Sequence, residues 1–188
     1  MKTIIYSAFL FISTFTVSLY STDYSVDTVH SSVGFSIKHN IVATTRGTFG
    51  SFIGEFSTDK KGKLSAINGT VTVSSIDTAN DKRDAHLRNP DFFEVDKYPE
   101  MKLVFKNYKG DKTSGTLEAE LTIKNITKVV PFKVELSEEV TTGKGKKVIG
   151  LSLSTTINRK DFTVGTSFAS ALISENVNIQ IDLEGHGK

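Results

Sequence analysis

Apolar and polar residues alternate along most of the chain from residue 22 onward. The last run is the clearest, since Val177, Ile179, Ile181 and Leu183 are separated by single polar residues. Successive side chains of a β-strand point to opposite faces, so each such run predicts a strand with one apolar face. Further runs occur in 33–37, 117–123, 130–136 and 149–157, with weaker ones in 67–76 and 101–108. The pattern predicts an all-β protein of about eight antiparallel strands.

These strands have to enclose their apolar faces. A closed barrel does so without leaving strand edges exposed, and a sandwich of two sheets is the alternative. Gly47, Gly50 and Gly54 fall within one otherwise aromatic strand. Glycines at such spacing are typical of a strand that bends around a barrel corner, so the pattern favours the barrel. Without an internal repeat or a low-complexity linker, residues 22–188 are predicted to form one domain.

The N-terminal segment 1–21 differs from the rest of the chain. Lys2 is followed by an apolar run from Ile4 to Val17, an order that is typical of a secretory signal peptide. A membrane anchor is the alternative, but the run is shorter than the ~20 apolar residues that span a bilayer. No basic cluster follows it. We therefore expect an exported protein with a cleaved leader and no stable membrane anchor.

Composition excludes several classes of function. The chain has 23 Lys and Arg against 21 Asp and Glu, for a formal net charge of +2. A nearly neutral chain does not suggest nucleic acid as a partner. The absence of cysteine excludes disulfides, thiolate nucleophiles and Cys-ligated metals.

One short α-helix is predicted at about 78–89, within the strand series. Thr78 begins a capping-box-like sequence, and Asn80 is the alternative first residue. Asp84 and Arg88 stand four residues apart, in the order that favours an ion pair on a helix surface. We expect this helix to lie across the wall or the mouth of the barrel, because its aromatic flank needs cover.

The same stretch, "RDAHLRNPDFF" at 83–93, also resembles an active site, because His86 is flanked by carboxylate and guanidinium groups. However, it contains no HExxH pair. The other histidines are scattered: His30, His39 and His186. No nucleophile elbow, phosphate loop or dinucleotide motif occurs either. The sequence therefore predicts no metal site, no cofactor and no catalytic residue, and a zinc site assembled from distant histidines is the alternative.

The second catalytic candidate is "DTVHSS", which places Asp27, His30 and Ser31 close together in the chain. The residues of a catalytic triad normally meet through the fold and not by adjacency, so this spacing carries little weight. We expect the protein not to be an enzyme. A hydrolase or isomerase that acts on a lipid through His86 or His39 is the alternative.

Four blocks of the sequence resemble one known family. They are "DTVHSSVGFSIKHNIVATTRGTFGSF", "RDAHLRNPDFFEVDKYPEM", "GTLEAELTIKNITKVV" and "INRKDF", and together they extend over residues 24–184. Their order and spacing resemble the YceI-like polyisoprenoid-binding proteins. One departure is Thr163, which follows Asp161 and Phe162 where the family has a glycine.

The resemblance implies an eight-stranded antiparallel, lipocalin-like barrel around an apolar tunnel, with a helix against it. It also implies a periplasmic or secreted protein, a possible homodimer and a long apolar ligand. The ligand classes are polyisoprenoids, isoprenoid quinones and lipids derived from fatty acids.

Alternation selects the side chains that would line such a tunnel. The candidate ligand-binding residues are Phe35, Ile37, Ala119, Leu121, Ile123, Phe132, Leu151, Leu153 and Ile179. A barrel of about eight strands either fills with side chains or holds one small ligand, and both cases need the same residue types. A structural β-module with a filled core is therefore a further alternative.

Overall fold

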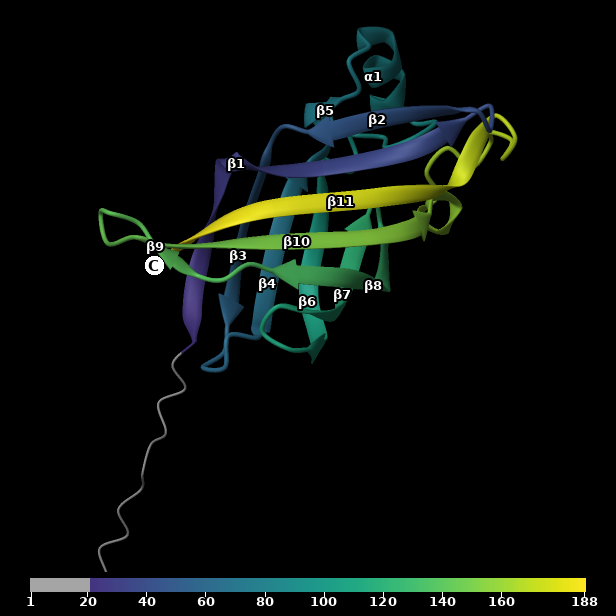
Figure 1. Ribbon diagram of the computed structural model, residues 1–188. Coiled ribbons are helices and arrows are strands. Elements are labelled where there is room, and N and C mark those ends of the chain that lie inside the picture. The colour runs from purple at the N-terminus through teal and green to yellow at the C-terminus, as the bar shows by residue number, and fades with distance from the viewer. Residues whose placement is uncertain (1–20) are drawn as a thin grey trace, which may run out of the picture.

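The strands of residues 21–188, the part of the chain that the computed structural model describes, close into an antiparallel barrel (Figure 1). The predicted signal peptide at 1–21 lies outside the described residues apart from Ser21. The strands are β1 (Thr22–His39), β2 (Ala43–Phe49), β3 (Phe52–Thr58), β4 (Leu64–Thr72), β5 (Ile76–Asp77), β6 (Glu100–Gly110), β7 (Ser114–Ile123), β8 (Ile126–Leu136), β9 (Val140–Thr141), β10 (Lys147–Asn158) and β11 (Ile173–Gly187). The helical elements within these residues are η1 (Val73–Ser75), α1 (Asp81–Arg88) and η2 (Arg159–Phe162).

The barrel closes through β1. The hydrogen-bonded series runs from β1 through β3, β4, β6, β7, β8 and β10 to β11, and β11 pairs again with β1. β2 and β3 pair with different halves of β1, so they are two parts of one bent strand. Counted in this way, the barrel has the eight strands that the sequence predicts. The two-residue strands β5 and β9 pair with β2 and β10, respectively.

The bend between β2 and β3 falls in the glycine-rich stretch where the sequence predicts a barrel corner. The chain leaves the ladder at Gly50 and Ser51, whose N–H groups donate to the carbonyl and the hydroxyl of Ser75 at 3.2 and 3.0 Å. Gly47 has a different role, because a Cβ there would lie 2.5 Å from the ring of Phe35. The missing side chain gives that ring its space on the inner face of the barrel.

One end of the barrel is filled by its own side chains. The rings of Tyr24 and Phe56 stack there with centroids 5.1 Å apart, and both residues are almost fully buried. Leu117, Val134 and Leu151 are at most 1% exposed. These residues belong to one continuous apolar cluster, so burial of apolar surface stabilises this end of a chain that has no disulfide.

Helix α1 lies at the opposite end, beside β5 and β2 (Figure 1). It begins after Asn80, whose side-chain oxygen accepts a hydrogen bond from the N–H of Arg83 at 3.0 Å. The second of the two predicted caps is therefore the one used. No helix of residues 21–188 is both long and apolar enough to cross a membrane.

The predicted ion pair between Asp84 and Arg88 is wrong. Asp84 is buried and accepts hydrogen bonds from the N–H and the hydroxyl of Thr78, which precedes the helix. Arg88 donates to the carbonyl oxygens of Ser74 and Ile76, each at 2.8 Å. Both side chains bind the segment before the helix and not each other, because burial makes these partners more favourable than a solvated surface pair. The result is a helix attached to the barrel by charged hydrogen bonds.

The packing of the filled end predicts that two residues of β3 contribute very differently to stability. Phe56→Ala should lower the free energy of unfolding by about 3–5 kcal/mol, because it removes a buried ring and leaves a cavity. Ile53→Ala, on the same strand but 72% exposed, should change it by less than about 0.5 kcal/mol. Urea denaturation followed by circular dichroism measures both. Equal midpoints for the two variants would show that this end is not tightly packed.

Candidate ligand-binding cavity

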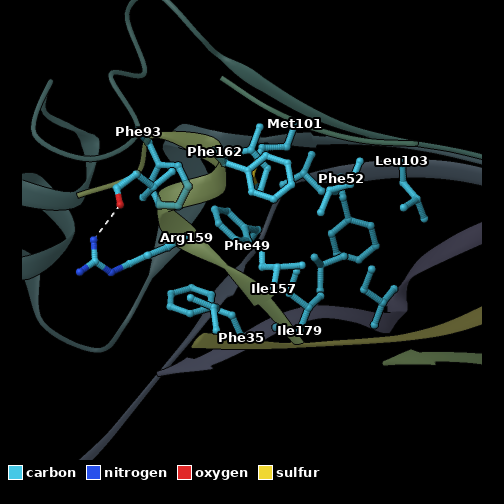
Figure 2. A pocket seen from close by; sticks show the side chains of 18 of the residues that line it. Phe35, Phe49, Phe52, Phe93, Met101, Leu103, Ile157, Arg159, Phe162 and Ile179 are labelled. Carbon is cyan, nitrogen blue, oxygen red and sulfur yellow. Dashed lines mark hydrogen bonds between the residues drawn. The ribbon is translucent and has the colours of Figure 1, made fainter. Parts of the chain in front are cut away.

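A cavity of about 420 Å³ occupies the half of the barrel next to α1. Apolar side chains from β1, β2, β3, β4, β6, β7, β8, β10 and β11 line it, and α1 and the segment that follows β10 border it. Figure 2 shows Phe35, Phe49, Phe52 and Ile179 gathered around this space. The cavity therefore lies between the filled end of the barrel and α1, with the barrel wall as its sides.

Seven of the nine predicted lining residues border the cavity: Phe35, Ile37, Leu121, Ile123, Phe132, Leu153 and Ile179. Ala119 and Leu151 do not, and both are at most 1% exposed within the filled end. On β7 the boundary falls between Ala119 and Leu121, and on β10 it falls between Leu151 and Leu153. Alternation correctly identifies the inner face of each strand but carries no information on depth along the barrel axis.

The aromatic residues that the sequence analysis did not select make up much of the lining. They are Phe49, Phe52, Phe92, Phe93, Phe162 and Phe168. Phe49 and Phe52 flank the bend between β2 and β3, where alternation is interrupted. The others lie in turns or in η2, where no periodic pattern exists. The aromatic pair Phe92 and Phe93 is visible in the sequence, but its position at the cavity is not.

His86 lies at the border of the cavity, where its contacts position the ring against neighbouring side chains. Its Nε2 lies 3.1 Å from a carboxylate oxygen of Asp91. The ring also makes edge contacts with Phe92 and Phe168, at centroid distances of 5.1 and 5.8 Å. These two phenylalanines stack on each other at 4.9 Å, so the imidazole completes an aromatic cluster that covers this end of the cavity.

Arg159 holds the segment between η2 and β11 in place. It is only 3% exposed, and burial lowers the pKa of its guanidinium below the usual value. Its N–H groups donate to the carbonyl oxygens of Val164, Gly165, Phe168, Ile173 and Ser174. All five donors of a guanidinium are then used, which leaves none for a ligand. In Figure 2 the guanidinium points away from the apolar side chains.

Hydrogen bonds of Glu175 also hold the segment between η2 and β11 in place. Glu175 accepts hydrogen bonds from the ammonium of Lys160 at 2.8 Å, from the amide of Asn158 at 3.1 Å and from the hydroxyl of Ser170. These bonds, led by that from Lys160, lower the pKa of Glu175 to about 2. Thr163 begins the segment in the left-handed conformation, with φ 53°, which glycine adopts more readily than a residue with a Cβ.

The second catalytic candidate does not form a triad. Nδ1 of His30 lies 2.9 Å from a carboxylate oxygen of Asp27, but the hydroxyl of Ser31 accepts a hydrogen bond from the N–H of Glu184 at 2.9 Å. The hydroxyl is thus engaged with β11 and not with the imidazole. His39, the other histidine of the enzyme alternative, lines the cavity at the opposite end of β1.

The barrel wall is irregular beside the cavity. β1 pairs with β3 through Thr22–Ser25 and with β2 through Gly34–His39, so the intervening residues have no partner on that side. Val26 and Val33 mark the two ends of this break, and Phe52 and Gly54 lie opposite on β3; all four line the cavity. The break therefore brings the cavity close to the surface of the wall.

A closed antiparallel barrel that is filled at one end and holds an apolar cavity at the other has the architecture of a small-ligand-binding barrel. Residues 24–185 match the YceI-like domain, and the chain belongs to the YceI family.

Relatives of known sequence and structure agree with this assignment. The chain is 32% identical to protein YceI of Shigella flexneri over 171 residues, which cover 89% of this chain and 88% of that protein. It is 34% identical to a UPF0312 protein of Staphylococcus aureus, covering 87% and 93% of the two chains. The crystal structure of the Campylobacter jejuni YceI protein matches with a TM-score of 0.76 at 32% identity, over 88% of this chain and 98% of that one.

A more distant structure shares the fold alone. It is a polyisoprenoid binding domain from Saccharophagus degradans, with a TM-score of 0.64 at 15% identity, over 88% of this chain and 98% of that one.

The buried guanidinium leads to a stability prediction. Arg159→Met should lower the free energy of unfolding by about 2–4 kcal/mol, because it leaves buried carbonyl oxygens without donors. Arg46→Met, at an exposed position of β2, should change it by less than about 0.5 kcal/mol. Urea denaturation measures both, and amide hydrogen exchange should show faster exchange in 163–174 for the Arg159 variant. If the two variants unfold alike, the guanidinium does not hold this segment.

The low pKa of Glu175 predicts a pH dependence of defined sign. A carboxylate whose pKa falls from 4.5 in the unfolded chain to about 2 in the folded one stabilises the fold above pH 4.5. This contribution is lost as the pH falls from 4.5 towards 2. The stability difference between wild type and Glu175→Gln should therefore be constant above that range and shrink within it. Urea titrations at a series of pH values test this, and a difference independent of pH would contradict it.

Proposed function

We propose that this protein is an exported, periplasmic binding protein that holds one long apolar lipid in the barrel cavity. The observation that supports this proposal is the cavity. It has a volume of about 420 Å³ and is lined by apolar and aromatic side chains, in a barrel whose other half is filled. A filled β-module would need no such space. The Saccharophagus degradans domain, described as polyisoprenoid binding, supports the same class of ligand.

The apolar lining accounts for affinity without any catalytic group. Burying ten methylenes contributes roughly 8 kcal/mol before ordering costs, which corresponds to about micromolar affinity. Aromatic side chains suit a chain with branching methyl groups or unsaturation, because ring faces accept irregular apolar shapes. A polyisoprenoid fits this description best, with isoprenoid quinones and fatty-acid derivatives as further members of the class.

The charged residues at the border of the cavity suggest what the polar end of the ligand is. They are Lys38, Arg83, Lys102 and Arg159, and no Asp or Glu of residues 21–188 is among the lining residues. Arg159 donates to backbone carbonyls and Arg83 to Thr78, so neither forms a dedicated anion site. The border favours a neutral or anionic head group over a cationic one.

The geometry favours binding over catalysis. The carboxylate nearest His86 orients the ring against two phenylalanines, and the ring presents no activated nucleophile to the cavity. We therefore propose a carrier or storage role and not the lipid-directed hydrolase or isomerase. A homodimer and a cleaved signal peptide at 1–21 stay predictions, which gel filtration and N-terminal sequencing of the periplasmic protein would test.

Two matched insertions of a phenyl ring test the cavity. Ile179 is partly exposed and lines it, whereas Ala119 is fully buried beyond it. Ile179→Phe should leave the unfolding of lipid-free protein nearly unchanged but lower the lipid that copurifies, because the ring occupies the ligand's space. Ala119→Phe should instead destabilise the lipid-free protein by about 1–3 kcal/mol through overpacking.

The measurements are organic extraction with mass spectrometry for bound lipid and thermal unfolding after lipid removal. Wild type should yield an apolar lipid in a fixed ratio to protein, and added lipid should raise its melting temperature. The proposal fails if extraction of wild type gives no apolar molecule and if Ile179→Phe destabilises the protein as much as Ala119→Phe.

A further inference from the structure

The pairing of β1 with β11 is interrupted by a bulge. Asp27 pairs with Glu184 and Ser32 pairs with Asp182, so the segment 28–31 of β1 faces a single residue of β11. Such bulges redirect side chains and are common next to functional sites. Here the bulge turns His30 back towards β11, where Glu184 and His186 lie on the neighbouring strand.

Three side chains that can ligate metals meet at this bulge, and His186 lies beside two of them. Nδ1 of His30 lies 2.9 Å from a carboxylate oxygen of Asp27 and 3.8 Å from one of Glu184. Nε2 of His186 lies 3.4 Å from the same oxygen of Asp27 and 2.7 Å from the same oxygen of Glu184. The ligand atoms of Asp27, His30 and Glu184 all lie within 4.8 Å of one another, the one such group found in residues 21–188.

These distances suit one bound ion. Nitrogen and oxygen ligands about 2.0–2.2 Å from a tetrahedral Zn²⁺ are separated by roughly 3.3–3.6 Å. The separations of 2.7–3.8 Å between each imidazole and the two carboxylates bracket that range. His186 lies outside the group of three, so its ring has to rotate towards His30 to supply a fourth ligand. Two imidazoles with two carboxylates select Zn²⁺ or a similar transition metal, because Ca²⁺ and Mg²⁺ prefer oxygen ligands alone.

We propose that Asp27, His30, Glu184 and His186 form a binding site for a divalent transition-metal ion of the Zn²⁺ type. The site lies outside the cavity and does not depend on the proposed lipid. An ion there would join β1 to β11 across the bulge. Val26 and Leu183, the chain neighbours of two ligands, line the cavity, so the ion would stiffen the cavity wall where the pairing of β1 is weakest.

Lys146 is the natural competitor of the ion. Its ammonium lies 2.6 Å from Nδ1 of His186, which accepts a hydrogen bond from it, while Nε2 of the same ring faces Glu184 at 2.7 Å. The positive charge of the ammonium also repels a cation bound at Nε2. Replacing Lys146 should thus strengthen metal binding, an effect that a cluster serving only as hydrogen-bonded structure would not show.

Isothermal titration with ZnCl₂ tests the proposal on purified, chelator-treated protein that carries no polyhistidine tag and has been freed of lipid. We expect one ion per chain at micromolar affinity or tighter. His30→Ala and His186→Ala should each weaken binding at least tenfold, and Lys146→Met should strengthen it several-fold. His39→Ala, a histidine at the other end of β1, is the matched control and should bind as wild type does.

Thermal unfolding supplies an independent readout. Zn²⁺ at a hundredfold excess over its dissociation constant should raise the melting temperature by about 5 °C or more, whereas Mg²⁺ and Ca²⁺ should not. The side chain of His30 is 63% exposed, so His30→Ala should fold even if His186→Ala does not. Equal Zn²⁺ affinities for wild type, His30→Ala and His39→Ala would overturn the proposal, as would the absence of saturable binding to wild type.

Discussion

The structure depends on the double pairing of β1. This one strand of 18 residues pairs with β11 on one side and with β3 and then β2 on the other. Its ladders join the first and the last parts of the described chain, and they convert an open sheet of hairpins into a barrel without free edges. With no cysteine in the sequence, closure rests on these hydrogen bonds and on the apolar contacts beneath them.

Closure explains why a cavity can persist beside a packed core. The filled end, built around Tyr24 and Phe56, buries enough apolar surface to hold the strands together. The other half can then hold a cavity lined by apolar residues such as Ile179. A cavity lowers the free energy of unfolding, and the packing of the filled end compensates for this loss. α1 and the Arg159-bound segment cover that half with charged hydrogen bonds to backbone, which need no additional apolar core.

The sequence predicts those features that depend on local pattern. Strand number, inner faces and the corner at Gly50 all follow from spacing or from turn chemistry, and the structure agrees with each. Of the two helix caps that the sequence offers, the structure uses the alternative, Asn80. Depth along the barrel is different, because Ala119 and Leu121 are identical in pattern yet lie on opposite sides of the cavity boundary. The role of Arg159 was also out of reach, since its partners are backbone carbonyls of the segment that follows it. Asp84 was assigned to the wrong partner, because burial directs it to Thr78 and not to Arg88.

Several features that the sequence could not show lie where β1 departs from regular pairing. One side of the strand loses its partner beside the cavity, and the other side bulges opposite β11. His30 and His186 are separated by most of the chain and carry no common motif, so only the register of β1 on β11 brings them to the same two carboxylates. A regular strand would place His30 in simple alternation with its neighbours. The bulge instead brings His30 to Asp27 and Glu184, which are one residue away from Val26 and Leu183, and these two line the cavity on the inner face of the same two strands.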